Sequence, residues 1–131
     1  ERRHAAITQA RLPFLVAVAE HEVLGYAYAS RYNTRSAYRF TCEDSVYVAH
    51  DARRRGVGLA LMTELIGACE RLGLKQMVAV IGDSGNQASR RLHAKVGFSD
   101  AGVLQHVGFK AGRWLDVVLM QRVLAASPAV Q

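Results

Sequence analysis

One stretch of the chain combines three local signals whose order restricts the fold. The residues from Phe40 to Ala49 form a strand-like run, a triple arginine follows at 53–55, and Gly56 begins an amphipathic segment that ends at Leu72. The first N–H groups of a helix have no internal partner, and the helix dipole favours an anion beside them. Glycine at positions 56 and 58 is expected to let a ligand approach the backbone. The stretch therefore predicts an α/β unit that holds a phosphate group at a helix start.

Two common phosphate-binding motifs do not fit this loop. A P-loop ends in Gly-Lys-Ser/Thr, whereas Leu59 and Ala60 follow Gly58. A dinucleotide-binding fingerprint needs a small residue where this chain has Leu61, and it needs an acidic partner for the ribose that is not placed as that motif requires. The remaining pattern is Arg53-x-x-Gly56-x-Gly58, for which a solvated basic turn without a ligand is the alternative.

Size and charge limit the class of protein. A chain of 131 residues, half of them hydrophobic and only two of them proline, is expected to form one globular domain. The net charge of +6 comes largely from short clusters at 31–39, 53–55 and 90–91, which lack interleaved aromatic residues. An anionic small molecule explains these clusters at least as well as nucleic acid does, so no nucleic-acid partner is expected.

The cysteines and the apolar runs point to a cytoplasmic protein. Cys42 and Cys69 have no metal or redox spacing and are expected to be buried, reduced thiols, although the sequence leaves a bridge open. No apolar run approaches the roughly 18 residues of a membrane-spanning helix, so no membrane partner is expected. No cluster of metal ligands is visible, so no metal is expected either.

Hydrophobic periodicity predicts a mixed α/β sheet with helices packed on it. The expected strands are 13–20, 23–32, 40–49, 76–81, 98–109 and 113–123, and the expected helices are 56–72 and 86–96. A tight hairpin turn is expected at His21-Glu22. The buried stripe of the first helix is expected at Val57, Leu61, Leu65, Ala68 and Leu72. Residues 1–124 are expected to form a single domain, and 125–131 a loose tail.

Five further stretches carry a family resemblance. They are Tyr32-Asn33-x-Arg35-x-Ala37-Tyr38, Glu43-Asp44-Ser45-Val46-Tyr47-Val48, Val78-Ala79-Val80-Ile81-Gly82, Leu92-His93-x-x-x-Gly97-Phe98 and Val107-Gly108-Phe109-Lys110-x-Gly112-x-Trp114-x-Asp116-Val117. With the Arg53–Gly58 loop, these stretches resemble the GNAT acetyltransferases, and more narrowly the phosphinothricin and methionine sulfoximine N-acetyltransferase branch. The order of elements is similar to the GNAT fold without its first strand and first helices.

The resemblance implies an activity. Acetyl would pass from acetyl-CoA directly to the primary amine of a small amino-acid-like acceptor in a ternary complex, in a homodimeric enzyme without a metal. Two alternatives stay open. One is another amine acceptor, such as an aminoglycoside, a polyamine or a protein N-terminus. The other is an acyl-CoA-binding domain without catalysis.

The resemblance also implies a cofactor site. The backbone of Val46, Tyr47 and Val48 would pair with the pantetheine arm, and an N–H near Val48 would polarise the thioester carbonyl. The pyrophosphate would rest on the amides of one loop, formed by Arg53, Arg54, Arg55, Gly56, Val57, Gly58, Leu59 and Ala60. Asn86 and Ser89 would contact the pantetheine arm, with a helix cap as the alternative role of Asn86.

Two residues are candidates for proton transfer. Glu43 lies in a strand expected to enter the core, where burial raises the pKa of a carboxyl group toward that of a general base. The resemblance places a catalytic glutamate here, acting through water; a surface residue or an arginine partner is the alternative. His93 shares a helix stripe with Asn86 and Ser89. It would protonate the leaving thiolate or orient the amine, with a packing histidine as the alternative.

The acceptor site is expected around the loop before Glu43. Arg31, Arg35 and Tyr38 flank this loop, and an arginine fork suits a carboxylate or phosphinate group. Solvated loop arginines are the alternative of about equal weight. Trp114 is expected to belong to the core more readily than to a site, and His106, Val107, Phe109 and Trp114 are further candidates for a pocket or a dimer face.

Overall fold

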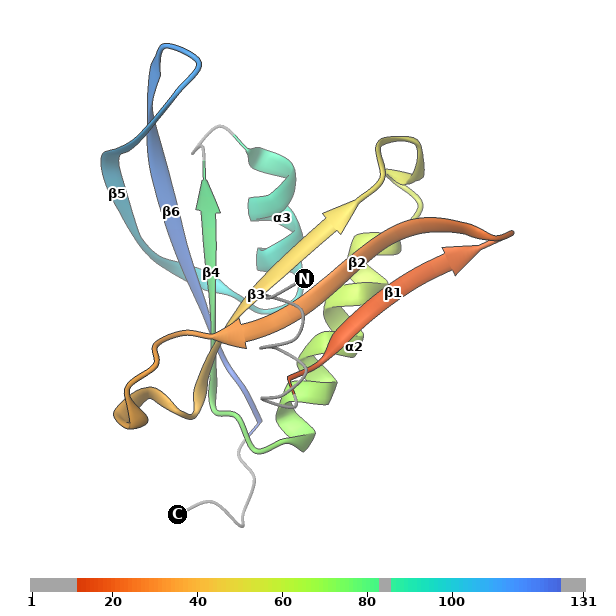
Figure 1. The fold of residues 1–131 in the computed structure, drawn as a ribbon, viewed down its shortest axis with the longest axis horizontal. Helices are drawn as coiled ribbons and strands as arrows, with labels where there is room; N and C mark the ends of the chain where they lie inside the picture. Colours follow the sequence, from red (N-terminus) through yellow and green to blue (C-terminus); the bar gives the residue numbers. More distant parts are fainter. Residues whose placement is uncertain (1–11, 83–85, 126–131) are drawn as a thin grey trace.

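The structure is a computed structural model that describes residues 12–82 and 86–125. It contains one six-stranded sheet with the strand order β1-β2-β3-β4-β6-β5, drawn in Figure 1. The strands are β1 (Phe14–Ala19), β2 (Glu22–Arg31), β3 (Thr41–Val48), β4 (Gln76–Gly82), β5 (Ser99–Lys110) and β6 (Arg113–Val123). The helices are α2 (Val57–Arg71) and α3 (Gln87–Lys95), with short 3-10 turns at Ser36–Tyr38 and His50–Ala52. The predicted order of elements is confirmed.

The hairpin between β1 and β2 turns one residue earlier than predicted. Glu20 and His21 occupy the turn with φ of 51° and 68°, whereas Glu22 already pairs with Ala19 in the sheet. Two successive left-handed residues match the right-handed twist of the flanking strands. The prediction of His21-Glu22 as the turn was therefore wrong by one position.

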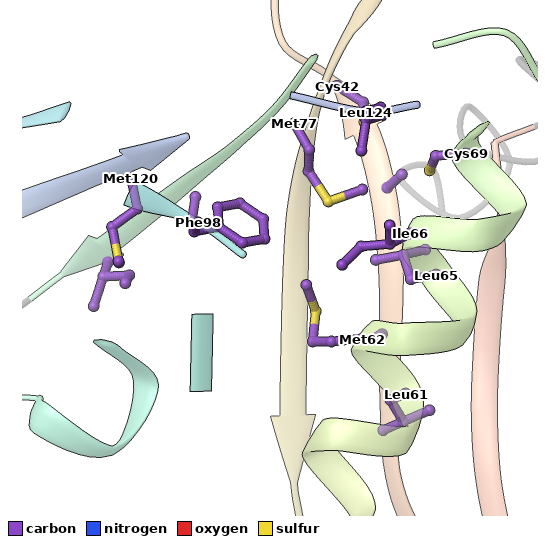
Figure 2. Packing of buried hydrophobic residues seen from close by; sticks show 14 of the residues in the cluster. Cys42, Leu61, Met62, Leu65, Ile66, Cys69, Met77, Phe98, Met120 and Leu124 are labelled. Carbon is purple, nitrogen blue, oxygen red and sulfur yellow. The ribbon is translucent and has the colours of Figure 1, made fainter. Parts of the chain in front are cut away.

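Helix α2 covers one face of the sheet and supplies much of the core. Figure 2 shows side chains of α2, among them Leu61, Met62, Leu65 and Ile66, gathered against the neighbouring strands. The buried face is wider than the predicted stripe, and Leu72 is 52% exposed, so its prediction as a core residue was wrong. The helix ends at Arg71, and Gly73, with φ of 87°, redirects the chain through the bonds Gly73 N–H to Glu70 O and Leu74 N–H to Cys69 O. Leu74 rather than Leu72 then enters the core.

Strands β3 and β4 pair over only part of their length. They are parallel, and their pairing runs from Thr41 with Gln76 to Asp44 with Ala79. Beyond this point the strands diverge, and the V between them is visible in Figure 1. Strand β3 stays paired with β2 as far as Val48, and β4 stays paired with β6 as far as Gly82. The sheet thus opens at its centre while both halves keep their outer partners.

The alternation of strand side chains assigns neighbours on β3 to opposite faces of the sheet. Cys42 and Asp44 are buried on the face that α2 and α3 cover. Glu43 is opposite Ser30 and Ser45 is opposite Tyr28, both on the other face. The register with β2 is continuous along β3, so no bulge changes this assignment.

Strands β5 and β6 form a long hairpin whose turn lies at Ala111 and Gly112, both with positive φ. Trp114 stacks near Phe109 with ring centroids 4.8 Å apart but is 64% exposed, so its prediction as a core residue was wrong. Cys42 and Cys69 are free and buried, as predicted. Of the predicted tail 125–131, the residues from 126 onward lie outside the described residues. Among the helices that the structure describes, none is long and apolar enough to span a membrane.

Candidate active site

A cavity of about 280 Å³ occupies the opening between β3 and β4. Its walls come from three elements: Glu43, Asp44, Ser45, Val46 and Tyr47 of β3; Ala79, Val80, Ile81 and Gly82 of β4; and Asn86, Ser89 and His93 at and on α3. Because consecutive β3 residues point to opposite faces, residues from both faces of the sheet line this cavity. The widened gap between the two strands therefore connects the helix-covered face with the other face.

A buried carboxylate–histidine pair lies on the helix-covered side of the cavity. His93 Nε2 is 2.8 Å from Asp44 Oδ2, and the two side chains are 3% and 1% exposed. His93 Nδ1 is 2.8 Å from the backbone oxygen of Ser89, one helical turn earlier. The imidazole ring also packs edge-on against the Phe98 ring, with the two ring centroids 4.9 Å apart. Both ring nitrogens of His93 thus face protein acceptors.

These contacts change the protonation of His93. Burial lowers the pKa of the imidazole, but the hydrogen bond and the charge of Asp44, together with the Ser89 carbonyl, raise the pKa by more, so that it lies above its ordinary value. Cys42 precedes Asp44 by two residues on the same face. Its hydrogen bond with Cys69 and its burial raise the pKa of its thiol, which stays neutral beside the pair.

Glu43 and His93, the two predicted proton-transfer residues, line the same cavity. Glu43 is half-buried and belongs to the face opposite Asp44 and His93. The sequence analysis missed Asp44. A usable signal was present, because the alternation Cys42-x-Asp44-x-Val46 places a carboxylate on the core-facing side of a strand, where it needs a partner.

Asn86 and Ser89 also line the cavity, and their contact with the pantetheine arm stays a prediction. Asn86 Oδ1 accepts a hydrogen bond from the Ser89 N–H at 3.2 Å and caps α3. The alternative role of Asn86 as a helix cap is therefore confirmed. Cap and cavity wall are compatible roles, since a single acceptor atom makes the cap.

The two glycines of the loop before α2 have different surroundings. Gly56 precedes the helix with φ of 78°, and no side chain of the described residues caps this helix start. A Cβ on Gly56 would meet nothing within 4 Å, whereas one on Gly58 would lie 3.1 Å from Leu92 Cδ2. Gly58 therefore makes room for the Leu92 side chain of α3, and its expected role of leaving space for a ligand stays a prediction. The exposed arginines at 53–55 lie directly before this uncapped start.

The predicted acceptor-binding residues do not gather at the cavity. Arg31 lines a second cavity of about 280 Å³, together with Arg39, Thr41, Cys42 and three leucines. Arg35 and Tyr38 are exposed in the segment between β2 and β3, where Asn33 Oδ1 accepts a hydrogen bond from the Arg35 N–H. The structure brings none of the three to the walls of the β3–β4 cavity, and their role stays a prediction.

The geometry suits an elongated anionic ligand. Beyond Asp44 and Ala79 the strands β3 and β4 no longer pair with each other, so an extended chain carrying amides can enter between them. The uncapped start of α2 offers N–H groups to a phosphate. At the apex of the gap, Glu43 and the Asp44–His93 pair can move or hold protons.

Known proteins are similar to this chain in sequence. The chain is 57% identical to a phosphinothricin N-acetyltransferase of Alcaligenes faecalis over 124 residues, which are 95% of this chain and 63% of that protein. It is 46% identical over 110 residues to an L-methionine sulfoximine/L-methionine sulfone acetyltransferase of Pseudomonas paraeruginosa, covering 83% of this chain and 63% of that one. The chain thus spans less than two thirds of the length of these relatives.

A solved structure and a family model agree with these relatives. The crystal structure of a phosphinothricin acetyltransferase from Sinorhizobium meliloti, in complex with AcCoA, superimposes with a TM-score of 0.92 at 45% identity, covering 99% of this chain and 70% of that one. The model of the acetyltransferase (GNAT) family matches residues 1–98. Since this match covers most of the chain, and the solved structure is 45% identical with 70% of its length covered, the chain belongs to the acetyltransferase (GNAT) family.

Proposed function

We propose that this chain transfers an acetyl group from acetyl-CoA to the primary amine of a small amino-acid-like acceptor of the phosphinothricin or methionine sulfoximine type. The observation that carries the proposal is the cavity between the diverging strands β3 and β4, with Glu43 on one side and Asp44 and His93 on the other. The names of the similar proteins support the acceptor class.

The chain offers matching contacts for acetyl-CoA, which supplies the activated thioester. The part of β3 at Val46, Tyr47 and Val48, which diverges from β4, would hold the pantetheine arm as an added strand. The N–H groups at the start of α2 and the arginines at 53–55 would hold the pyrophosphate. Acetyl-CoA bound in this way places its thioester toward Asp44 and Ala79, where the strands meet.

Glu43 would act as the general base through a water molecule. In the overall reaction the amine nitrogen forms a bond to the acetyl carbon, the carbon–sulfur bond breaks, one proton leaves the amine and one proton joins the thiolate. Glu43 lines the cavity from the face opposite the Asp44–His93 pair, so the group that removes a proton and the proton-bearing pair approach the same cavity from opposite faces of the sheet.

The acceptor would carry its own negative charge, and Arg35 and Tyr38 are its proposed partners. Both are exposed in the segment that leads into β3. We expect Arg35→Ala to raise the acceptor KM and to leave acetyl-CoA affinity unchanged. Arg71→Ala, at an exposed position near the end of α2, is the matched control. An unchanged KM in Arg35→Ala would remove Arg35 from the proposed acceptor site.

The test of the activity follows thiol release from acetyl-CoA with a panel of amines. The panel contains phosphinothricin, methionine sulfoximine, methionine sulfone, common amino acids, spermidine, an aminoglycoside and a peptide with a free N-terminus. We expect release with the first three compounds. Release only with a polyamine, aminoglycoside or peptide would contradict the proposed acceptor class, and acetyl-CoA binding without release for any amine would favour a binding domain.

We also propose that the enzyme is a homodimer. The β5–β6 hairpin exposes Val107, Phe109 and Trp114, and the exposed fractions of the latter two are 61% and 64%. Burial of such aromatic side chains is a common source of interface stability. Light scattering after size exclusion should give the dimer mass, and Trp114→Ser should shift it toward that of the monomer. A monomer at all concentrations would contradict the proposal.

A further inference from the structure

The carboxylate of Asp44 is incompletely satisfied although it is fully buried. Its Oδ2 is hydrogen-bonded to His93, but Oδ1 has less than 1 Å² of exposed surface and no hydrogen-bond partner among the residues that the structure describes. A buried polar atom left without a partner costs about 1–3 kcal/mol, so native proteins rarely keep one without a reason. Asp44 is also one of the residues that line the β3–β4 cavity.

The hydrogen bonds of His93 determine what kind of partner Oδ1 can take. The Ser89 carbonyl only accepts hydrogen bonds, so the Nδ1 atom that faces it carries a proton. The 2.8 Å contact between Nε2 and Oδ2 holds a second proton, which the two atoms share. Whether this shared proton lies nearer to Nε2 or to Oδ2, Oδ1 carries no proton. Oδ1 is therefore an acceptor in both cases. Oδ1 therefore requires a donor.

We propose that Asp44 Oδ1 is a binding contact of the acetyl-transfer site, which accepts a hydrogen bond from an N–H or S–H group of a reactant in the β3–β4 cavity, and that His93 is the residue that positions it. This inference rests on the proposed function. Two reactants carry such a donor: the amine of the acceptor, and the pantetheine arm with its amides and its product thiol. Because both ring nitrogens of His93 are engaged by the protein, His93 meets the reactants through Asp44.

Among the described residues, few other titratable or charged side chains lie near the Asp44–His93 pair. From β3, Glu43 lines the cavity on the opposite face and Cys42 is a neutral thiol on the same face. The wall from β4 carries no titratable side chain. On α3, Arg90 lies 4.0 Å from Asp100, whereas Arg91 and Lys95 are exposed. The Phe98 ring closes the remaining side of His93.

The first test examines the pair without any ligand. Nitrogen-15 NMR of the imidazole distinguishes the doubly protonated ring from the neutral one. We expect His93 in the wild-type protein to stay doubly protonated above the ordinary histidine pKa of about 6.5. In Asp44→Asn the amide N–H donates to Nε2, and His93 should become neutral with its proton on Nδ1. A neutral His93 at the same pH in the wild-type protein would overturn the positioning role.

The second test separates the hydrogen bond from the charge. Asp44→Asn turns its amide nitrogen toward His93 and keeps an oxygen for the cavity, whereas Asp44→Ala removes the acceptor. We expect Asp44→Ala to weaken the binding of the reactant that contacts Oδ1 by roughly tenfold or more. Asp44→Asn should weaken it by less than Asp44→Ala, because it keeps a neutral acceptor, which binds less strongly than a charged one. Calorimetry gives the Kd of acetyl-CoA, and kinetics with methionine sulfoximine give the acceptor KM and kcat. Asp100→Ala, an exposed carboxylate on β5, is the matched control.

The two readouts identify the donor. A weaker acetyl-CoA Kd assigns the contact to the pantetheine arm, and a higher acceptor KM at unchanged Kd assigns it to the amine. If folded Asp44→Ala and Asp44→Asn both match the control in Kd, KM and kcat, the proposal is overturned. Failure of the proposed function gives a different pattern: the wild-type protein releases no thiol with the amine panel, while the NMR and the acetyl-CoA Kd still report on Asp44.

Discussion

At the scale of single residues, two consecutive carboxylates have different environments. Glu43 is half-buried on one face of β3, and Asp44 is buried on the other face against His93. A one-residue step along a strand reverses the direction of the side chain, so these two acids cannot substitute for one another. Glu43 can take a proton, whereas Asp44 already shares a proton with His93.

Replacing Glu43 should therefore slow catalysis without affecting cofactor binding. Glu43→Gln keeps the size of the side chain and removes the base, and a lost general base typically costs about 100-fold or more in kcat. Steady-state kinetics give kcat, and calorimetry should show an unchanged acetyl-CoA Kd. Glu64→Gln, on the exposed side of α2, is the control. Unchanged kcat in Glu43→Gln would exclude Glu43 as the base.

The raised pKa of His93 predicts how stability depends on pH. A histidine whose pKa is higher in the folded state than in the unfolded state stabilises the fold fully below its unfolded pKa of about 6.5. This contribution is lost as the pH rises through the folded pKa. The decrease in unfolding free energy that His93→Gln causes should thus be larger near pH 6 than near pH 9. Urea titrations at both values measure it, with His50→Gln as the exposed control. A loss that grows with pH would contradict the prediction.

At the scale of elements, the position of β3 depends on a close approach by β2. Gly25 pairs with Val48, and a Cβ on Gly25 would lie 2.5 Å from the backbone oxygen of Tyr47. No side chain rotation relieves a clash with backbone, so β3 itself would have to move. The segment that would move contains Tyr47 and Val48 of β3, and the other edge of this segment faces the β3–β4 cavity.

Gly25→Ala should therefore destabilise the fold by about 1–3 kcal/mol and weaken acetyl-CoA binding as well. Chemical denaturation and calorimetry measure the two effects. Gly67→Ala is the matched control, because its Cβ would meet only the flexible end of Arg71 at 3.3 Å. As alanine favours helix by about 1 kcal/mol over glycine, this control should be neutral or stabilising. Equal stability of Gly25→Ala and Gly67→Ala would contradict the assignment.

At the scale of the whole molecule, the two faces of the sheet differ. The helices α2 and α3 cover one face, while the face of β1 and β2 opposite α2 carries the stacked rings of Phe14, Tyr26 and Tyr28. Beside these rings, Val16 and Val18 are 50% and 60% exposed. An apolar surface of this kind promotes association, and the net charge of +6 opposes it.

Association of this chain should therefore increase with salt, which screens the charge. The double variant Val16→Thr, Val18→Thr keeps branched side chains on β1 and should reduce the association, because it removes apolar surface. Light scattering across a salt series measures the effect. Val123→Thr, which is 68% exposed at the end of β6, is the control. Equal association of the double variant and the control would contradict the role of this face.

The sequence by itself determined the order of elements and the strand–loop–helix unit. These features depend on local signals: the alternation of β3, the helical periodicity of α2, the glycines at its two ends, and the five family stretches. Each acts within about ten residues, so no tertiary contact is needed to recognise it. The errors at the hairpin turn and at Leu72 arose within one or two residues of an element end, where backbone conformation outweighs periodicity.

Only the tertiary structure decided what the polar residues contact. Asp44 and His93 are 49 positions apart, and their pairing depends on the packing of α3 against the end of the β3–β4 pairing. Gly58 turned out to accommodate Leu92, and Arg31 lies in a cavity away from Glu43. Local patterns state which side chains are polar, but the partner of each depends on strand register and helix position, which arise from packing over the whole chain.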